Sequence, residues 1–167
     1  MDIFWQRLEA LCDKSFEGVV THAPAGDTAF TNKVLVMEVR KCSENEIRIP
    51  FHVGENRSRT WVLTKQNNRL LLKHDHRHED GSEEHITQYG GWTPNSGQEG
   101  SQIFIADQAT TDLLPPASHN VWMIEIDPGN IFAYSLRRQG SDRYFRVSFD
   151  LKKEIKAPAA PWGWSDK

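Results

Sequence analysis

The dipeptide Asp80-Gly81 stands between two stretches of alternating residues and constrains the fold more than any other feature of the chain. Asp-Gly is a strong hairpin signal, because the favoured two-residue turn needs positive φ at both central positions. We therefore predict that residues 70–79 and 82–89 form two antiparallel strands joined by this turn. Such a pair needs further strands beside it, since an isolated hairpin is only marginally stable in water.

The predicted register assigns each side chain of this hairpin to one of two faces. A two-residue turn places His76 opposite His85 and Leu72 opposite Tyr89. Side chains alternate between faces along a strand, so the members of one face can be read directly from the sequence. That face is aliphatic at one end and rich in imidazole at the other, and it carries Leu70, Leu72, His74, His76, His78, Glu83, His85, Thr87 and Tyr89.

The opposite face of the hairpin is predicted to be solvated. It carries Lys73 and Asp75, and the register provides a cross-strand Arg77–Glu84 ion pair. The aliphatic and imidazole face is therefore the one expected to point inward.

The rest of the chain continues this pattern of short alternating runs. Short strands at roughly regular spacing with tight connections favour an antiparallel barrel or sandwich, and closure into a barrel removes exposed sheet edges. We predict an all-β fold: an antiparallel up-and-down β-barrel of about ten strands with a short N-terminal helix. A single domain is expected over residues 1–157, followed by a Pro- and Trp-rich tail over 158–167 that is either frayed or docked.

Composition excludes several classes of protein. The net charge of −3 includes no basic block of the kind that binds nucleic acid. No apolar run is long enough to cross a bilayer, and the N-terminus lacks the pattern of a signal peptide, so a cytoplasmic location is expected. Cys12 and Cys42 are then expected to be free thiols in a reducing compartment. The oligomeric state is left open.

Two resemblances concern most of the chain. The run KHDHRHEDG, followed by YGG, QIFIADQAT and SHNVWMIEI, resembles an uncharacterised family of small bacterial proteins, several members of which are secreted. That resemblance implies no established activity. The predicted layout is similar to that of the calycins, which include lipocalins, fatty-acid-binding proteins and nitrobindin-like barrels, and this likeness implies a ligand inside the barrel.

A third resemblance covers only part of a motif. His76 and His78, followed by Glu83 and Gly90, are spaced similarly to the first metal motif of cupins. The sequence departs from the cupin pattern at Leu70, where a glycine is expected, and His119 does not match the second motif. This resemblance implies a metal-dependent enzyme.

Two functional hypotheses follow from the inward face. The first is a barrel that binds a lipophilic or partly polar small molecule, with a His-lined end to its pocket. Its ligand-binding residues would be His74, His76, His78, His85, Tyr89, Leu72 and Thr87.

The second hypothesis is a cupin-like metal-dependent enzyme. Imidazoles two residues apart project from the same face of a strand and suit a divalent transition metal as cofactor. Its metal ligands would be His76, His78, Glu83 and His85. A solvated His-rich surface is the third possibility, so whether the chain is an enzyme stays open at this point.

Overall fold

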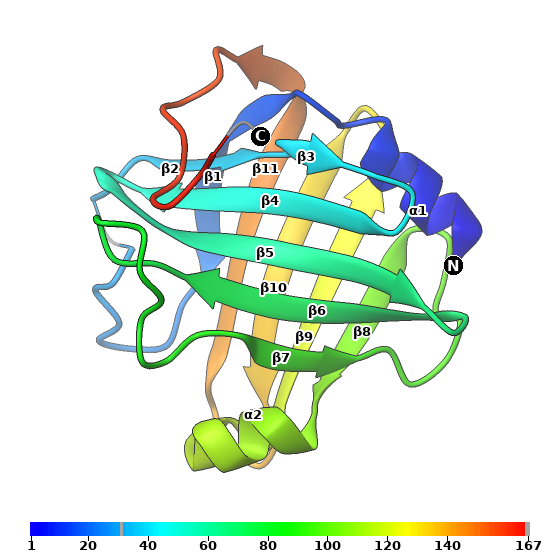
Figure 1. The fold of residues 1–167 in the computed structure, drawn as a ribbon, viewed down its shortest axis with the longest axis vertical. Coiled ribbons are helices and arrows are strands. Elements are labelled where there is room, and N and C mark those ends of the chain that lie inside the picture. Colours follow the sequence, from blue (N-terminus) through cyan, green and yellow to red (C-terminus); the bar gives the residue numbers. More distant parts are fainter. Residues whose placement is uncertain (31, 166–167) are drawn as a thin grey trace.

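A computed structural model describes residues 1–30 and 32–165 of the chain, and its strands close into an antiparallel β-barrel (Figure 1). The two helices are α1 (Asp2–Glu9) and α2 (Gln108–Leu113), and a 3₁₀ turn, η1, covers Pro115–Ala117. The strands are β1 (Ser15–His22), β2 (Leu35–Glu38), β3 (Lys41–Cys42), β4 (Glu46–Val53), β5 (Asn56–Gln66), β6 (Arg69–His76), β7 (Tyr89–Trp92), β8 (Ser101–Ala106), β9 (Asn120–Asp127), β10 (Ile131–Arg138) and β11 (Tyr144–Ile155).

The strands follow one another around the barrel almost in sequence order. The sheet order is β2-β1-β11-β10-β9-β8-β7-β6-β5-β4-β3, and a β2–β4 pairing closes the ring and leaves the two-residue β3 outside it. The ring therefore has ten strands, which confirms the predicted up-and-down barrel. Within the part of the chain described, no helix combines the length and apolar character needed to span a membrane.

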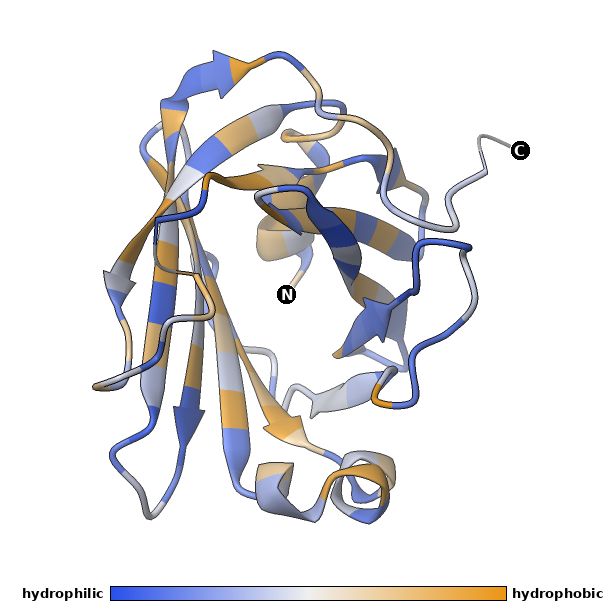
Figure 2. Cartoon of the chain, turned by 90° about the vertical axis from the view of Figure 1, so that its left-hand side faces the viewer, coloured by the Kyte–Doolittle hydropathy of each residue, from blue (hydrophilic) through white to orange (hydrophobic). Residues whose placement is uncertain are grey.

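Alternating side chains build the core inside the barrel. Ile49 pairs with Trp61, which pairs with His74, so these three inward side chains form one row across β4, β5 and β6. Hydrophobic and hydrophilic residues alternate along the same strands in Figure 2. This is the pattern expected when one face of each strand packs inward.

Helix α1 covers one end of the barrel. Phe4, Trp5 and Leu8 are buried in the same cluster as the inward strand residues, and they lie on one side of the helix. Figure 1 places α1 at the right-hand end, and Figure 2 looks into the opposite end with α1 behind. Helix α1 therefore closes one end of the barrel, and no part of α1 covers the opposite end.

The first predicted strand of the hairpin is confirmed by β6, but the second, residues 82–89, is wrong, because β7 begins only at Tyr89 and residues 82–88 form a loop. Strand β6 ends at His76, and β7 pairs with it only from Tyr89, so His74 lies opposite Tyr89 and not opposite Thr87. Of Asp80 and Gly81, only Gly81 has positive φ. An isolated bridge pairs Arg77 with Glu83, so the turn between them contains one residue more than the predicted two-residue turn. The predicted two-residue turn and the His76–His85 pairing are therefore wrong.

Two local features accompany the altered register. The Asp80 carboxylate accepts hydrogen bonds from Ser82 N at 2.9 Å and Ser82 Oγ at 2.6 Å, which holds a wider turn than Asp-Gly alone would form. Gly90 and Gly91 then fit β7 tightly between β6 and β8. Because the partner of His74 changes by two residues, from Thr87 to Tyr89, His74 and Tyr89 keep their predicted inward face.

Cys12 and Cys42 form a disulfide, so the prediction of two free thiols is wrong. The bond joins the segment after α1 to strand β3, across a sequence separation of 30 residues. It ties the helix that covers one end of the barrel to the sheet. Sequence spacing does not reveal this pairing, because the two residues meet only after the barrel has closed.

Replacing both cysteines by alanine is expected to lower the free energy of unfolding by roughly 3–4 kcal/mol, since the bond restricts a long loop of the unfolded chain. Urea unfolding of the double variant and of the wild type measures this difference. Wild-type protein under reducing conditions is the control and should match the variant. Equal unfolding midpoints in all three samples would contradict a stabilising disulfide.

The C-terminal tail docks against the barrel. Trp162 N donates to Arg57 O at 3.1 Å, and Arg57 Nη1 donates to Ala160 O at 2.9 Å. The Arg40 guanidinium lies 5.3 Å from the ring centre of Trp164. Residues 166–167 of the predicted 158–167 tail lie outside the described residues.

Candidate functional site

A cavity of about 140 Å³ is lined by residues near the start of β5 and the end of β6, which Figure 1 places at the end of the barrel away from α1. Aromatic side chains are the most numerous in its wall. Two histidines also line it, and its charged side chains are two arginines and one aspartate. The lining residues are Asp27, Phe30, Phe51, Arg59, Thr60, Trp61, His74, His76, Tyr89, Tyr134, Leu136, Arg143 and Phe145.

Three stacked aromatic rings form part of the cavity wall. The ring of Trp61 lies 4.8 Å from that of Phe51 and 4.4 Å from that of Tyr134, with interplanar angles of 14° and 18°. All three side chains are buried. A wall of aromatic side chains favours a ligand with an apolar ring, because such side chains bury a large apolar area.

His74 is buried, with 4% of its surface exposed, and both of its ring nitrogens have partners. Nδ1 lies 3.0 Å from Tyr89 O, and Nε2 lies 2.7 Å from Tyr134 Oη. Its ring stacks on that of Tyr89 at 4.6 Å. Burial lowers the pKa of His74 to about 3, and the hydrogen bond to Tyr89 O opposes this only in part, so the imidazole is neutral at pH 7.

His76 and Tyr89 form a second polar pair at the cavity wall. Tyr89 Oη lies 3.1 Å from His76 Nε2, and the other ring nitrogen of His76 lies 3.8 Å from Glu84 Oε2. Burial lowers the pKa of His76, and Arg59 lowers it further, while the Glu84 carboxylate opposes both effects. Burial also raises the pKa of the Tyr89 hydroxyl to about 12, so this phenol stays protonated.

The arginines approach the same pair. Arg59 lies opposite His76 in the β5–β6 ladder, and its Nη1 donates to Asn56 Oδ1 at 2.9 Å. Arg143 precedes β11 and is exposed. The positive charges of Arg59 and Arg143 both lower the pKa of the Tyr89 hydroxyl, against the larger effect of burial. The cavity mouth thus carries two guanidinium groups against one lining carboxylate, that of Asp27.

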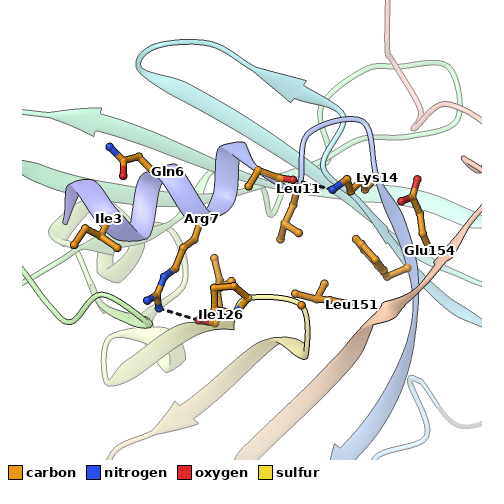
Figure 3. Close-up of a pocket in the computed structure, with 12 residues that line it drawn as sticks. Ile3, Gln6, Arg7, Leu11, Lys14, Ile126, Leu151 and Glu154 are labelled. Atoms are coloured by element: carbon orange, nitrogen blue, oxygen red, sulfur yellow. Dashed lines mark hydrogen bonds between the residues drawn. The ribbon is translucent and has the colours of Figure 1, made fainter.

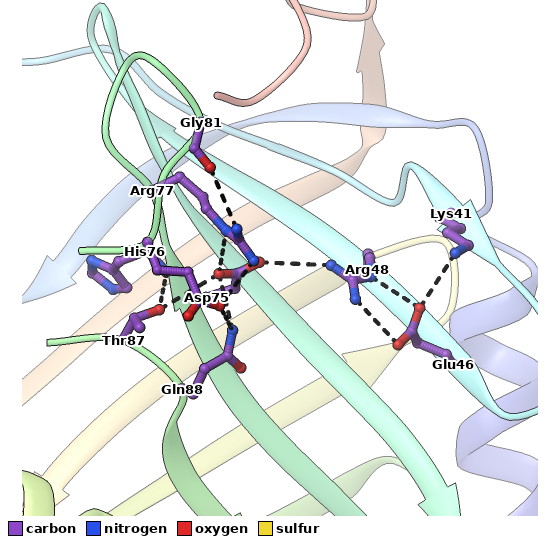
Figure 4. Close-up of polar contacts among 10 residues, drawn as sticks. Lys41, Glu46, Arg48, Asp75, His76, Arg77, Gly81, Thr87 and Gln88 are labelled. Carbon is purple, nitrogen blue, oxygen red and sulfur yellow. Dashed lines mark hydrogen bonds and ion pairs between the residues drawn. The ribbon is translucent and has the colours of Figure 1, made fainter. Parts of the chain in front are cut away.

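A buried carboxylate on the outer face of β6 holds the loop of residues 77–88 in place (Figure 4). Asp75 is only 5% exposed, and its Oδ1 accepts hydrogen bonds from Arg77 Nε at 2.9 Å and Gln88 Nε2 at 3.0 Å. Arg48 Nη1 lies 3.6 Å from Oδ2 of the same carboxylate. The prediction that this face is solvated is therefore wrong at Asp75, because the loop folds back over it.

The predicted Arg77–Glu84 pair does not form. Arg77 pairs instead with Asp75 and with Glu83, whose Oε1 lies 3.1 Å from Arg77 Nη2. Glu84 lies beside His76 on the cavity side. The wider turn at Asp80-Gly81 causes this exchange, since one additional loop residue changes which glutamate faces Arg77.

The structure brings three of the predicted ligand-binding residues together at the cavity: His74, His76 and Tyr89. Leu72 lies deeper, fully buried in the barrel core. Thr87 is buried but turns away from the cavity, since its Oγ1 accepts from His76 N at 2.8 Å and lies 3.5 Å from Asp75 Oδ1.

The remaining predicted residues lie on the loop. His78 and His85 are exposed, and Glu83 is 52% exposed and paired with Arg77. Neither histidine lines the cavity. Across residues 1–30 and 32–165, no group of three or more His, Cys, Asp or Glu side chains could hold a metal ion, so the set His76, His78, Glu83 and His85 does not assemble.

Sequence reasoning missed several residues of the cavity, and one of them could have been found. Arg59 shares the inward face of β5 with Trp61, and β5 joins β6 through an Asn67-Asn68 turn with positive φ at both residues. Extending that hairpin by one pair beyond Trp61–His74 places Arg59 opposite His76. Tyr134 and Phe145 come from distant strands, and only the closed barrel brings them to the site.

A larger hollow of about 360 Å³ lies beside α1 at the other end (Figure 3). Ile3 and Leu11 line it together with Ile126 and Leu151, and Arg7 Nη1 donates to Ile126 O at 3.4 Å. The charged side chains of this hollow do not meet at one point, whereas the polar side chains of Tyr89, His74 and His76 lie together at the mouth. The mouth cavity is therefore the candidate site.

Comparisons of the chain with protein families, with curated proteins and with solved structures found no match. The resemblance to an uncharacterised bacterial family therefore stays a prediction. The ten-stranded antiparallel barrel itself is compatible with the calycin-like layout.

Proposed function

We propose that this protein is a small-molecule-binding barrel whose ligand is a planar, single-ring organic anion held in the mouth cavity. One observation supports the proposal: the stacked rings of Phe51, Trp61 and Tyr134 line the same cavity as two neutral histidines. Ligand sites generally combine an apolar wall with a few convergent polar groups.

The size of the cavity limits the ligand. A volume of about 140 Å³ is too small for a fatty acid or a tetrapyrrole. An engineered protein cavity of about 150 Å³ accepts benzene, which sets the scale of one ring. The proposal therefore narrows the lipophilic ligand predicted from the sequence to a molecule of this size.

Two guanidinium groups at the mouth can pair with an anion, although the carboxylates of Asp27 and Glu84 lie nearby. Arg59 and Arg143 supply two guanidinium groups near Tyr89, and planar guanidinium groups pair well with carboxylates. His74 and His76 add no positive charge at pH 7, since burial lowers the pKa of both. The ligand's carboxylate would lie toward the arginines, and its ring against Trp61.

The Cys12–Cys42 disulfide favours an oxidising compartment over the cytoplasm predicted from the sequence. Structural disulfides persist mainly in secreted and periplasmic proteins, because cytosolic thiol systems reduce them. The proposed ligand would then be one that the protein meets outside the cytoplasm.

Calorimetric titration with benzoate tests the proposal, with benzamide as the neutral analogue. We expect saturable benzoate binding that weakens about tenfold or more in Arg59→Gln and in Arg143→Gln, because each change removes a charge-assisted contact. Benzamide affinity should change little in either variant.

Arg137→Gln is the matched control, since it removes the same charge from an exposed residue of β10 next to the inward Leu136. Its benzoate affinity should equal that of the wild type. Absence of saturable benzoate binding, or equal losses in Arg137→Gln and the two mouth variants, would contradict the proposal.

A further inference from the structure

The direction of the hydrogen bonds in the cavity can be assigned from His74. Tyr89 O is a carbonyl oxygen and only accepts, so the His74 Nδ1 that lies 3.0 Å away carries the hydrogen. A neutral imidazole carries one N–H, and His74 is neutral. Its Nε2 therefore accepts, and the Tyr134 hydroxyl donates its proton to it across 2.7 Å.

The hydrogen bond of the Tyr89 hydroxyl has the same direction, from tyrosine to histidine. Glu84 Oε2 lies 3.8 Å from His76 Nδ1, and a nearby carboxylate favours the tautomer with the hydrogen on that nitrogen. Nε2 of His76 then accepts, and the Tyr89 hydroxyl donates its proton to it across 3.1 Å. Each tyrosine thus gives its only hydroxyl proton to a histidine.

These assignments give the cavity wall a polarity that its composition does not reveal. Tyr89 and Tyr134 both line the cavity, and each hydroxyl oxygen keeps a free lone pair and has no proton left to donate. A ligand that enters an aromatic cavity displaces most of the water in it. A hydrogen-bond donor on the ligand then stabilises the complex, because the free lone pair of a buried tyrosine oxygen would otherwise have no partner. The donors among the lining residues are instead the guanidinium groups of Arg59 and Arg143, the indole N–H of Trp61 and the hydroxyl of Thr60.

We propose that the ligand is a hydroxylated aromatic carboxylate, whose hydroxyl donates to Tyr134 Oη or Tyr89 Oη while its carboxylate accepts from the arginines. This inference rests on the proposed function and names the ligand class of the same site. A ring that carries a hydrogen-bond donor at one side and an anion at the other matches the acceptors and donors of the wall. An unsubstituted ring leaves the tyrosine oxygens unpaired.

Binding of 3- and 4-hydroxybenzoate, each compared with the fluorobenzoate that has fluorine in place of the hydroxyl, tests the inference by calorimetry. Fluorine has a similar size and donates no hydrogen bond. We expect at least one hydroxybenzoate to bind the wild type about tenfold more tightly than its fluoro analogue. In Tyr134→Phe the ratio of hydroxybenzoate to fluorobenzoate affinity should fall toward one when Tyr134 is the acceptor, and in Tyr89→Phe when Tyr89 is the acceptor.

Tyr144→Phe is the control for the loss of a tyrosine hydroxyl, because Tyr144 packs against His22 and Arg137 and does not line the cavity. Its hydroxy-to-fluoro ratio should match the wild type. If fluorobenzoates bind as tightly as both hydroxybenzoates, the inference is overturned while the proposed function stands. If none of these acids shows saturable binding, both are overturned.

Imidazole ¹⁵N chemical shifts of the unliganded protein test the premise without any ligand. His74 should be protonated at Nδ1 and unprotonated at Nε2 at pH 7. Protonation at Nε2 would mean that Tyr134 accepts from the histidine and offers its proton to the cavity, which would reverse the expected preference and overturn the inference.

Discussion

Lowering the pH from 7 to 4 is expected to destabilise the barrel steeply, because at least two histidines are buried in their neutral form. Burial lowers the pKa of His52 to about 4, with Arg57 and Arg40 adding to the effect, and burial lowers the pKa of His74 to about 3. The unfolded chain binds these protons near pH 6.5. Stability is therefore complete above pH 6.5 and is lost as the pH falls from there toward 4.

The size of this effect follows from proton linkage. Between pH 6.5 and 4, each histidine lowers the free energy of unfolding by about 1.4 kcal/mol per pH unit, so the two together approach about 3 kcal/mol per unit. Over two units this is comparable with the whole stability of an ordinary domain. His76 acts in the same direction, since its pKa is also lowered.

Urea unfolding between pH 7.5 and 4.5 measures this slope in the wild type, in His52→Gln and in His78→Gln. His52 is 4% exposed, and its Nε2 has no hydrogen-bond partner among the described residues, so glutamine should reduce the slope by about one proton. His78 is exposed, and its replacement should leave the slope unchanged. A stability that is flat over this range, or an equal change in both variants, would refute buried neutral histidines.

A single methyl group at Gly91 is expected to be among the most damaging changes in the chain. A Cβ at this position would lie 1.7 Å from Ile105 O and 2.5 Å from Ile105 C, both of them backbone atoms of the neighbouring strand β8. Strand β7 has four residues and pairs with β6 and β8 at once, so it cannot move away from one without leaving the other. We expect Gly91→Ala to cost roughly 4 kcal/mol or more.

Thermal unfolding of Gly91→Ala checks this, with Gly100→Ala as the matched control. A Cβ at Gly100 would have its nearest contact at 3.2 Å with Arg7 Nη1, the flexible end of a side chain. The control should stay within about 1 kcal/mol of the wild type. Similar melting temperatures for the two variants would show that β7 is not held as tightly as its contacts indicate.

The sequence was sufficient to predict the barrel, because alternation survives small errors of register. The predicted partner of His74 was Thr87 and the actual partner is Tyr89, a shift of two residues that preserves which face each side chain occupies. For this reason the inward position of His74 and Tyr89 could be predicted. His78 and His85 could not be placed, since they lie where the ladder gives way to a loop.

Other parts of the site depend on contacts between distant segments. Asp75 alternates as an outward residue should, yet it is buried because Arg77 and Gln88 fold back to it. Tyr134 reaches His74 across the closed barrel, from a strand 60 residues further along the chain. Periodicity describes one strand at a time and carries no information about such partners.

The most direct test of the central claim uses the six tryptophans as reporters, through their indole N–H signals in ¹⁵N–¹H spectra during a benzoate titration. Trp61 lines the mouth cavity, whereas Trp5 belongs to α1 at the opposite end and Trp164 to the docked tail. The account predicts that the Trp61 signal moves in a saturable way while those of Trp5 and Trp164 stay in place. An unmoved Trp61 signal at saturating benzoate, or a larger shift at Trp5, would contradict a ligand site at the mouth of the barrel.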